Sequence, residues 1–137
     1  MRLALLPGLA LLAGCASYSS HGVRPLRPLE LATAPYQEAV TSSLTGSLMY
    51  EGGCLLFRED RTKAHFLPVW PTGSIFNGTA LTFHQPGKAD QPVLVGEELE
   101  IEGQPSPWSA LPPATFAPFQ QQCAAEPFLV SRVRPAD

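Results

Sequence analysis

The spacing of prolines is the feature of this sequence that most limits its fold. Fifteen prolines are distributed over 137 residues, and proline breaks the interior of a helix because it lacks a backbone donor. This density argues against a helical bundle. A hydrophobic fraction of 45% argues against a disordered chain, and the length allows one small domain. The formal net charge of −3 argues against a nucleic-acid partner, which requires a basic face.

Short apolar runs separated by turn residues predict a mainly β domain. Gly52-Gly53 and Asn77-Gly78 each suit a two-residue hairpin turn, in which positive φ angles are favoured. Six or seven short strands about ten residues apart predict a small antiparallel barrel or sandwich, of which an OB-like barrel is one form. The predicted strands are 46–51, 54–58, 65–70, 74–76, 79–84, 93–102 with a bend at Gly96, and 128–133.

One short helix is expected near the N-terminus of this domain, over residues 36–44. Pro35 suits the first position of a helix, although Thr41, Ser42 and Ser43 are poor helix formers. The prediction is therefore a mainly β domain with at most this one helix.

The first fifteen residues have the features of an export signal. A basic second residue precedes an apolar stretch over 3–13, which is too short to cross a bilayer. Leu12-Ala13-Gly14-Cys15 resembles the lipobox of bacterial lipoproteins. The resemblance implies that Cys15 carries diacylglycerol, that the signal peptide 1–14 is removed, and that the new amino group is acylated. Two or three acyl chains anchor a protein stably. The alternative is an ordinary secretory signal with a chance cysteine.

The residues after Cys15 suggest a destination and a linker. In Gram-negative lipoproteins an aspartate directly after the cysteine signals retention in the inner membrane, so Ala16 implies the outer membrane, on its periplasmic side. Residues 15–35 are rich in serine, glycine and proline and are expected to form a lipidated linker. Residues 36–137 are then the folded domain.

A second resemblance involves segments inside the predicted domain. The segment 67–71 (LPVWP) with Gly73, and Val95-Gly96 with Gly103, are similar to segments of small secreted bacterial domains of unknown function. This resemblance implies no activity.

Two cysteines remain once Cys15 is assigned to lipid. Exported proteins meet an oxidising compartment, so Cys54 and Cys123 are predicted to form a disulfide. Closing so long a loop stabilises the fold by about 4 kcal/mol in the chain-entropy model. The alternative is a reactive thiol that uses His65 or His84 as a base, but no local motif supports it.

Residues 104–122 combine five prolines with Trp108, Phe116 and Phe119. Two interpretations are open. The segment is either an extended loop that binds a partner through its aromatic side chains, or a lid folded over one end of the barrel. Trp70 likewise either lines a binding cleft or packs in the core. These four aromatic residues are the candidate binding surface.

No motif predicts a catalytic residue, a metal site or a cofactor. Glutamates between residues 97 and 102 alternate with Leu99 and Ile101, which indicates a strand with one acidic face rather than a calcium loop. The histidines share no spacing typical of metal ligands; they are His21, His65 and His84.

These observations favour a membrane-anchored lipoprotein of the cell envelope that acts as a non-enzymatic binding or structural module. Its partner would be an envelope protein or polymer. A second hypothesis is a carrier or sensor of a lipid, sugar or metal, with a pocket inside the barrel. A third is a hydrolase that acts on envelope polymers through paired carboxylates.

Overall fold

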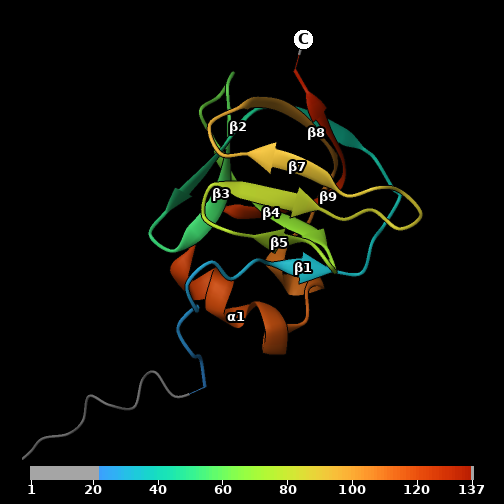
Figure 1. Cartoon of the computed structure of the whole chain (residues 1–137). Coiled ribbons are helices and arrows are strands. Elements are labelled where there is room, and N and C mark those ends of the chain that lie inside the picture. Colours follow the sequence, from blue (N-terminus) through green and yellow to red (C-terminus); the bar gives the residue numbers. More distant parts are fainter. Residues whose placement is uncertain (1–21, 137) are drawn as a thin grey trace, which may run out of the picture.

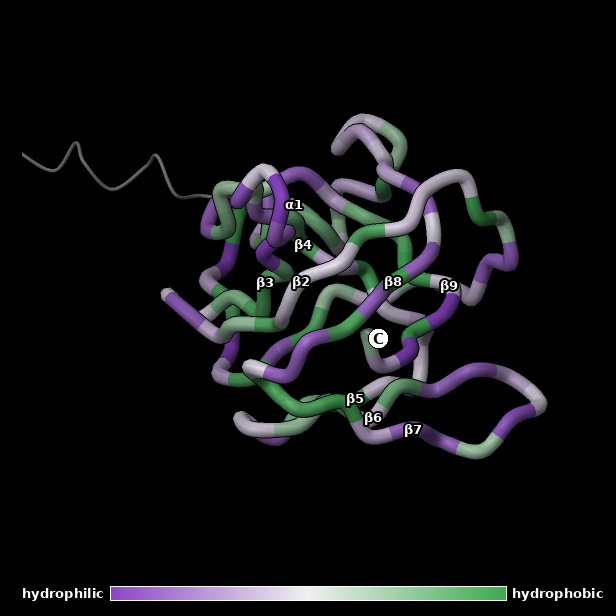
Figure 2. Tube along the Cα trace, turned by 90° about the horizontal axis from the view of Figure 1, so that it is seen from above, coloured by the Kyte–Doolittle hydropathy of each residue, from purple (hydrophilic) through white to green (hydrophobic). Residues whose placement is uncertain are grey.

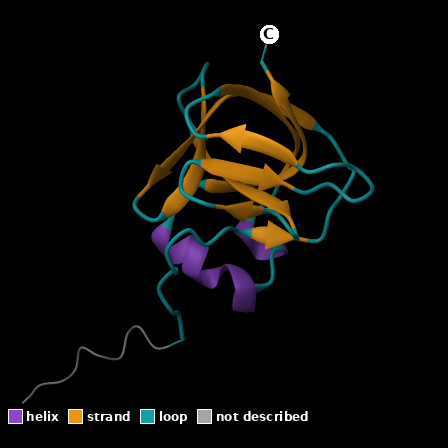
Figure 3. Cartoon of the chain, viewed as in Figure 1, coloured by secondary structure: helices purple, strands orange, loops and turns teal. Residues whose placement is uncertain are grey.

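The computed structural model describes residues 22–136, and it confirms the predicted mainly β class. The helical segments lie together at one end of the domain (Figure 3). Both follow β8 in the chain: a 3₁₀ turn η2 (Trp108–Ala110) and the helix α1 (Pro113–Gln122). The strands are β1 (Thr33–Ala34), β2 (Ser42–Glu51), β3 (Cys54–Glu59), β4 (His65–Pro71), β5 (Ile75–Phe76), β6 (Ala80–Phe83), β7 (Gln91–Leu94), β8 (Glu98–Pro105) and β9 (Glu126–Pro135).

Two sheets make up the fold. The larger has the order β1-β4-β3-β2-β8-β9. Because β4 also pairs with β9 in parallel, five of its strands form a closed circuit of hydrogen-bonded pairs. The smaller sheet has the antiparallel order β5-β6-β7 and lies along one side of the larger one (Figure 2).

The hairpin between β2 and β3 has the turn that the sequence predicts. Glu51 lies opposite Cys54, and the two residues between them, Gly52 and Gly53, have φ angles of 61° and 80°. Positive φ at both central positions is the requirement of a type I′ turn, so the glycine pair sets the register of this hairpin.

The hairpin between β5 and β6 is shifted by one residue from its prediction. The Asn77 N–H donates to the Ala80 carbonyl at 3.1 Å, so Gly78 and Thr79 are the central residues, and Gly78 has the positive φ. The Asn77 carboxamide oxygen instead accepts from the Thr79 N–H at 2.9 Å. Asn77 therefore orders the turn through its side chain rather than through its own φ.

One hydrophobic cluster joins the two sheets. Side chains from β2, β3, β4, β8 and β9 pack against the inner face of β5–β7. A second cluster lies on the opposite face of β3 and β4, beneath α1. Residues 54–57 of β3 are consequently buried without interruption, as expected for a strand covered on both faces.

The predicted N-terminal helix is wrong in position. Residues 42–51 form β2, which pairs with β3 on one side and β8 on the other. The backbone N–H and C=O groups of this segment therefore bond to neighbouring strands instead of within a helix. The helix of this domain is α1, near the C-terminus, with Pro113 in its first turn. Proline suits that position because it has no N–H to leave unsatisfied.

Packing begins well before residue 36, where the linker was expected to end. β1 pairs in parallel with β4, Ala32 is buried, and Leu26 packs on the cluster beneath α1. Residues 22–35 are thus part of the folded unit. The predicted signal peptide 1–14, Cys15 and the start of the linker lie outside the described residues.

Candidate functional site

The aromatic residues proposed as a binding surface are mostly buried. Trp70 is 1% exposed, Phe116 and Phe119 are each 3% exposed, and Trp108 is half-buried against the cluster beneath α1. Because α1 places Phe116 and Phe119 on the outer face of β3 and β4, these side chains cover the sheet. They are not available to a partner in this conformation.

The predicted disulfide is confirmed. Cys54, the first residue of β3, is bonded to Cys123 at the end of α1, with Cα atoms 5.9 Å apart. Both residues are buried. The disulfide therefore links the end of α1 covalently to the first hairpin. Neither sulfur is a free nucleophile.

The segment that carries η2 and α1 is uncharged. No charged residue occurs between Gly103 and Ala125. The N-terminal segment runs beside α1 and forms two shallow grooves with it, of about 470 and 380 Å³. Their lining includes Val23, Arg24 and Pro118.

Specific contacts hold this N-terminal segment in place. The Gln122 side chain accepts a hydrogen bond from the Leu26 N–H at 3.2 Å and donates one to the Gly52 carbonyl at 3.0 Å. The Arg24 guanidinium donates to both carboxylate oxygens of Glu30, and these bonds lower the pKa of Glu30. The segment is thus fixed to both the helix and the first hairpin.

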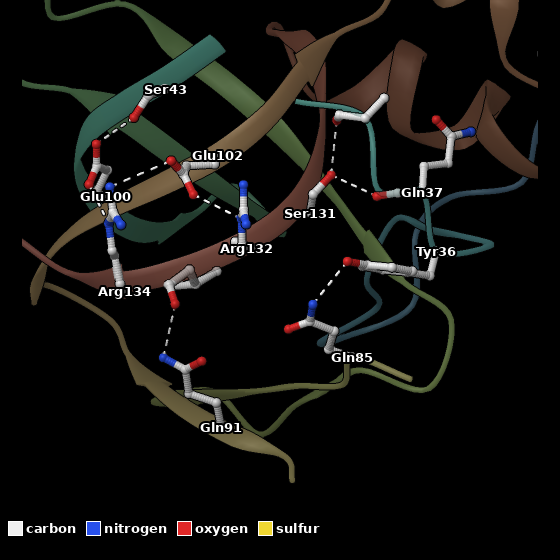
Figure 4. Close-up of polar contacts among 12 residues, drawn as sticks. Tyr36, Gln37, Ser43, Gln85, Gln91, Glu100, Glu102, Ser131, Arg132 and Arg134 are labelled. Carbon is white, nitrogen blue, oxygen red and sulfur yellow. Dashed lines mark hydrogen bonds and ion pairs between the residues drawn. The ribbon is translucent and has the colours of Figure 1, made fainter. Parts of the chain in front are cut away.

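A polar groove lies over β9, on a different part of the surface. A bulge separates Gly103, which pairs with Val130, from Glu102, which pairs with Arg132. The residue between Val130 and Arg132 on β9, Ser131, is buried, and its hydroxyl contacts the backbone carbonyls of Gln37 and Ala39 (Figure 4). Sequence alternation from Val130 would have turned Arg132 inward, and the bulge turns it outward.

Ion pairs between β8 and β9 form the floor of this groove (Figure 4). Arg132 contacts Glu102 at 3.0 Å, and Arg134 contacts Glu100 at 2.6 Å. Hydrogen bonds from Arg134 and Ser43 lower the pKa of Glu100. The acidic face predicted for 97–102 is therefore largely paired with arginines of the neighbouring strand.

The rim of the groove is the loop between β6 and β7. Gln85 donates to the Tyr36 hydroxyl at 2.9 Å, and Gln91 donates to the Val133 carbonyl at 3.2 Å. These bonds fix the loop at both of its ends. Two adjoining hollows of about 330 and 360 Å³ share Gln85, Lys88 and Arg132.

The groove retains unused hydrogen-bonding groups. Within residues 22–136 the Lys88 ammonium has no ion-pair or hydrogen-bond partner, and the Tyr36 hydroxyl accepts one bond from Gln85 and donates none. The lining of the two hollows contains no serine, cysteine or histidine. The lining offers an ammonium, guanidinium groups, amides and carboxylates, which are groups that bind polar ligands.

The remaining histidine and acidic candidates do not converge. His84 contacts Asp90 at 2.9 Å, while His65 begins β4 opposite Arg58. Over residues 22–136, no group of three or more His, Cys, Asp or Glu side chains is arranged to hold a metal ion. His21 lies outside the described residues.

The polar groove could not be predicted from the sequence. It depends on the bulge at Ser131 and on the contact between Tyr36 and Gln85, residues 49 apart in the chain. Neither residue belongs to a recognisable motif.

In the part of the chain that the structure describes, no helix has the length and apolar character needed to cross a bilayer.

Comparisons of this chain with family models, with curated proteins and with solved structures give no match.

Proposed function

We propose that this protein is a lipid-anchored, non-enzymatic module of the cell envelope that binds an envelope polymer in the groove over β9. The anchor would be Cys15, in the sequence Leu12-Ala13-Gly14-Cys15 that resembles a lipobox. The observation that carries the binding role is the pair of adjoining hollows that share Gln85, Lys88 and Arg132.

The chemistry of the groove suits a polymer rich in hydroxyl and carboxylate groups. Lys88 and the Arg132 guanidinium can receive a carboxylate. The side-chain carbonyl oxygen of Gln85 can accept a hydrogen bond from a hydroxyl group, and the Tyr36 hydroxyl can donate one to it. Both ends of the rim are held by hydrogen bonds, which lowers the entropic cost of binding.

The core gives less support to a carrier with an internal pocket. The largest buried side chains, among them Trp70, Phe57, Phe83 and Phe128, fill the space between the strands. A closed circuit of five strands leaves little room beyond its own side chains. The open groove on the outside is therefore the better candidate site.

We also propose that the five-strand circuit is an OB-like barrel. β2, β3, β4, β8 and β9 would be its five strands, and the parallel contact between β4 and β9 would close it. The three-stranded sheet β5–β7 stands between the third and fourth strands, where that fold normally carries a helix, and α1 stands between the fourth and fifth.

The anchor is tested by the intact mass of the full-length protein purified from membranes of a Gram-negative host. The expected mass corresponds to a chain that begins at Cys15 with two or three acyl groups. An unmodified Cys15 would overturn the anchor.

The groove is tested with the chain's own matched control, because Lys63 and Lys88 are its two lysines. The full-length protein is treated with an amine-acetylating reagent in the presence of oligogalacturonate, and acetylation at each lysine is read by mass spectrometry. Binding in the groove protects Lys88 and leaves Lys63 unchanged.

Two further reagents test the specificity of this protection. A neutral galactan oligomer should protect Lys88 weakly, since it lacks the carboxylate. Polyglutamate supplies carboxylates without sugar hydroxyls, so equal protection by polyglutamate, or equal protection of both lysines, would overturn the proposed polymer site.

A further inference from the structure

The attachment point of the proposed anchor is close to one end of the domain. Six residues, 16–21, separate Cys15 from Gly22, and fully extended they span at most about 25 Å. Gly22 lines the groove formed with Pro113, Ala114 and Ala117 of α1. Any lipid on Cys15 is therefore within about 25 Å of the α1 end.

Residues 22–35 do not form a free linker that would increase the distance between Cys15 and the α1 end. Leu26 is held by Gln122 of α1, and Arg24 is clamped to Glu30. The Leu29 N–H donates to the Tyr50 hydroxyl at 3.1 Å. Residues 22–35 are therefore packed on the domain and add no length between Cys15 and the α1 end.

The surface at this end is suited to a lipid interface. The exposed side chains of α1 are small, prolyl or amide-bearing: Pro113, Ala114, Thr115, Gln120, Gln121 and Gln122. Placing charged side chains in a lipid interface costs desolvation energy, and α1 itself has none to desolvate. Trp108, half-buried beside α1, belongs to a residue type enriched at membrane interfaces.

The distribution of charge favours the same orientation. The acidic strand β8 crosses the part of the domain remote from α1, and the C-terminus also lies there (Figure 1). Beside α1, Arg24 lines both grooves and is paired with Glu30. Glu100 and Glu102 of β8 are paired with arginines of β9. Placing that end of the domain in a lipid interface would desolvate these ion pairs, whereas α1 brings no charged side chain to the interface.

From these observations we infer that the α1 end rests on the lipid bilayer, with the exposed side chains of α1 and Trp108 in contact with the headgroup region. This inference rests on the proposed anchor at Cys15. It directs the β8 end away from the membrane that holds the protein and leaves the loop between β6 and β7 at the side of the domain (Figure 1). The occupant of the α1 surface is lipid rather than a second protein.

The two tryptophans provide the test, since Trp108 lies beside α1 and Trp70 is buried in the core. The full-length lipidated protein is reconstituted into phosphatidylcholine–phosphatidylglycerol vesicles that contain lipids brominated near the headgroup. Bromine quenches tryptophan fluorescence at short range. We expect quenching about two-fold stronger in the wild type than in Trp108→Phe, in which only Trp70 emits.

Equal quenching in the two proteins would overturn the inference, because Trp108 would then lie no closer to the lipid than the core does. A second variant avoids dependence on Trp108→Phe folding normally. Gln120→Glu combined with Gln121→Glu adds charge to the exposed face of α1 and should reduce quenching in anionic vesicles. Unchanged quenching in this variant would also count against the inference.

Flotation of the same vesicles separates this inference from the proposed anchor. A protein that floats with the vesicles but shows equal quenching is anchored with a different orientation, which overturns only the inference. A protein that does not float, and whose Cys15 is unmodified by mass, lacks the anchor and overturns both.

Discussion

Gln122 accepts a hydrogen bond from the backbone N–H of Leu26 although the two residues are 96 positions apart in the chain. The same side chain donates to the Gly52 carbonyl, one residue from the turn's second glycine and two from the disulfide-bonded Cys54. One amide thus connects the N-terminal segment, the first hairpin and the end of α1.

Replacing Gln122 with alanine should loosen the N-terminal segment while the rest of the fold stays intact. The two lost hydrogen bonds are exposed, so we expect a loss of about 1 kcal/mol in the free energy of unfolding. Hydrogen exchange at the Leu26 amide should become faster. Gln121→Ala is the matched control, because Gln121 is the neighbouring exposed glutamine; equal effects of both substitutions would contradict the bridging role of Gln122.

Removing the disulfide should cost far more than removing this bridge. Cys54 and Cys123 are 69 residues apart, and the chain-entropy model assigns about 4 kcal/mol to closing a loop of that size. Cys54→Ala with Cys123→Ala should therefore lower the urea midpoint strongly. The same loss should follow chemical reduction of the wild type, and a midpoint unchanged by reduction would contradict the structural role of the bond.

Gly103 should not tolerate a side chain. A Cβ at this position would lie 1.8 Å from the Leu129 carbonyl oxygen, so β8 and β9 would have to separate at the bulge. We expect Gly103→Ala to cost about 3 kcal/mol or more in unfolding free energy. Gly96→Ala is the control: Gly96 has a φ of 88° and open space around it, so its cost should be about 1 kcal/mol. A smaller cost at Gly103 than at Gly96 would contradict the close strand contact.

The features that could be predicted from the sequence are those set by neighbouring residues. Gly52 and Gly53 determine a turn through their own φ angles, and the alternation around Leu99 and Ile101 determines which side of β8 is buried. The pairing of Cys54 with Cys123 is predicted by elimination, on the expectation that Cys15 carries lipid.

The features that could not be predicted depend on distant contacts. The pairing of β4 with β9 has no local signal, and neither has the bulge at Ser131 that turns Arg132 toward the groove. The 104–122 segment was expected to be a loop because of its prolines. Within it, residues 113–122 form α1, and Pro113 lies in the first turn, where proline is tolerated. Burial of Phe116 and Phe119 beneath the same helix then stabilises it despite the internal Pro118.

Acid should release the N-terminal segment before it unfolds the domain. Hydrogen bonds from Arg24 hold the pKa of Glu30 below its ordinary value. A carboxylate whose pKa is lowered by folding contributes stability above its unfolded pKa, about 4.3, and loses it as the pH falls through the folded value. The protection factors of the Arg27 and Glu30 amides, which correct for the slower intrinsic exchange in acid, should therefore fall below about pH 4. Glu30→Gln should show fast exchange already at pH 7, whereas a wild type equally protected at pH 3 and pH 7 would contradict the contribution of this clamp.

Glu98 should have the opposite dependence on pH. A hydrogen bond with Asp60 raises the pKa of Glu98, since the two carboxyl groups interact best while they share a proton. A group whose pKa is raised by folding contributes stability at low pH and loses it as the pH rises through the folded value. Glu98→Gln should thus raise the melting temperature slightly at pH 7 and leave it unchanged below about pH 4. Glu97→Gln serves as the control for loss of a charge at the adjacent position. A lower melting temperature for Glu98→Gln at pH 7 would instead mean that attraction to Lys63, which opposes the effect of Asp60, is the stronger interaction.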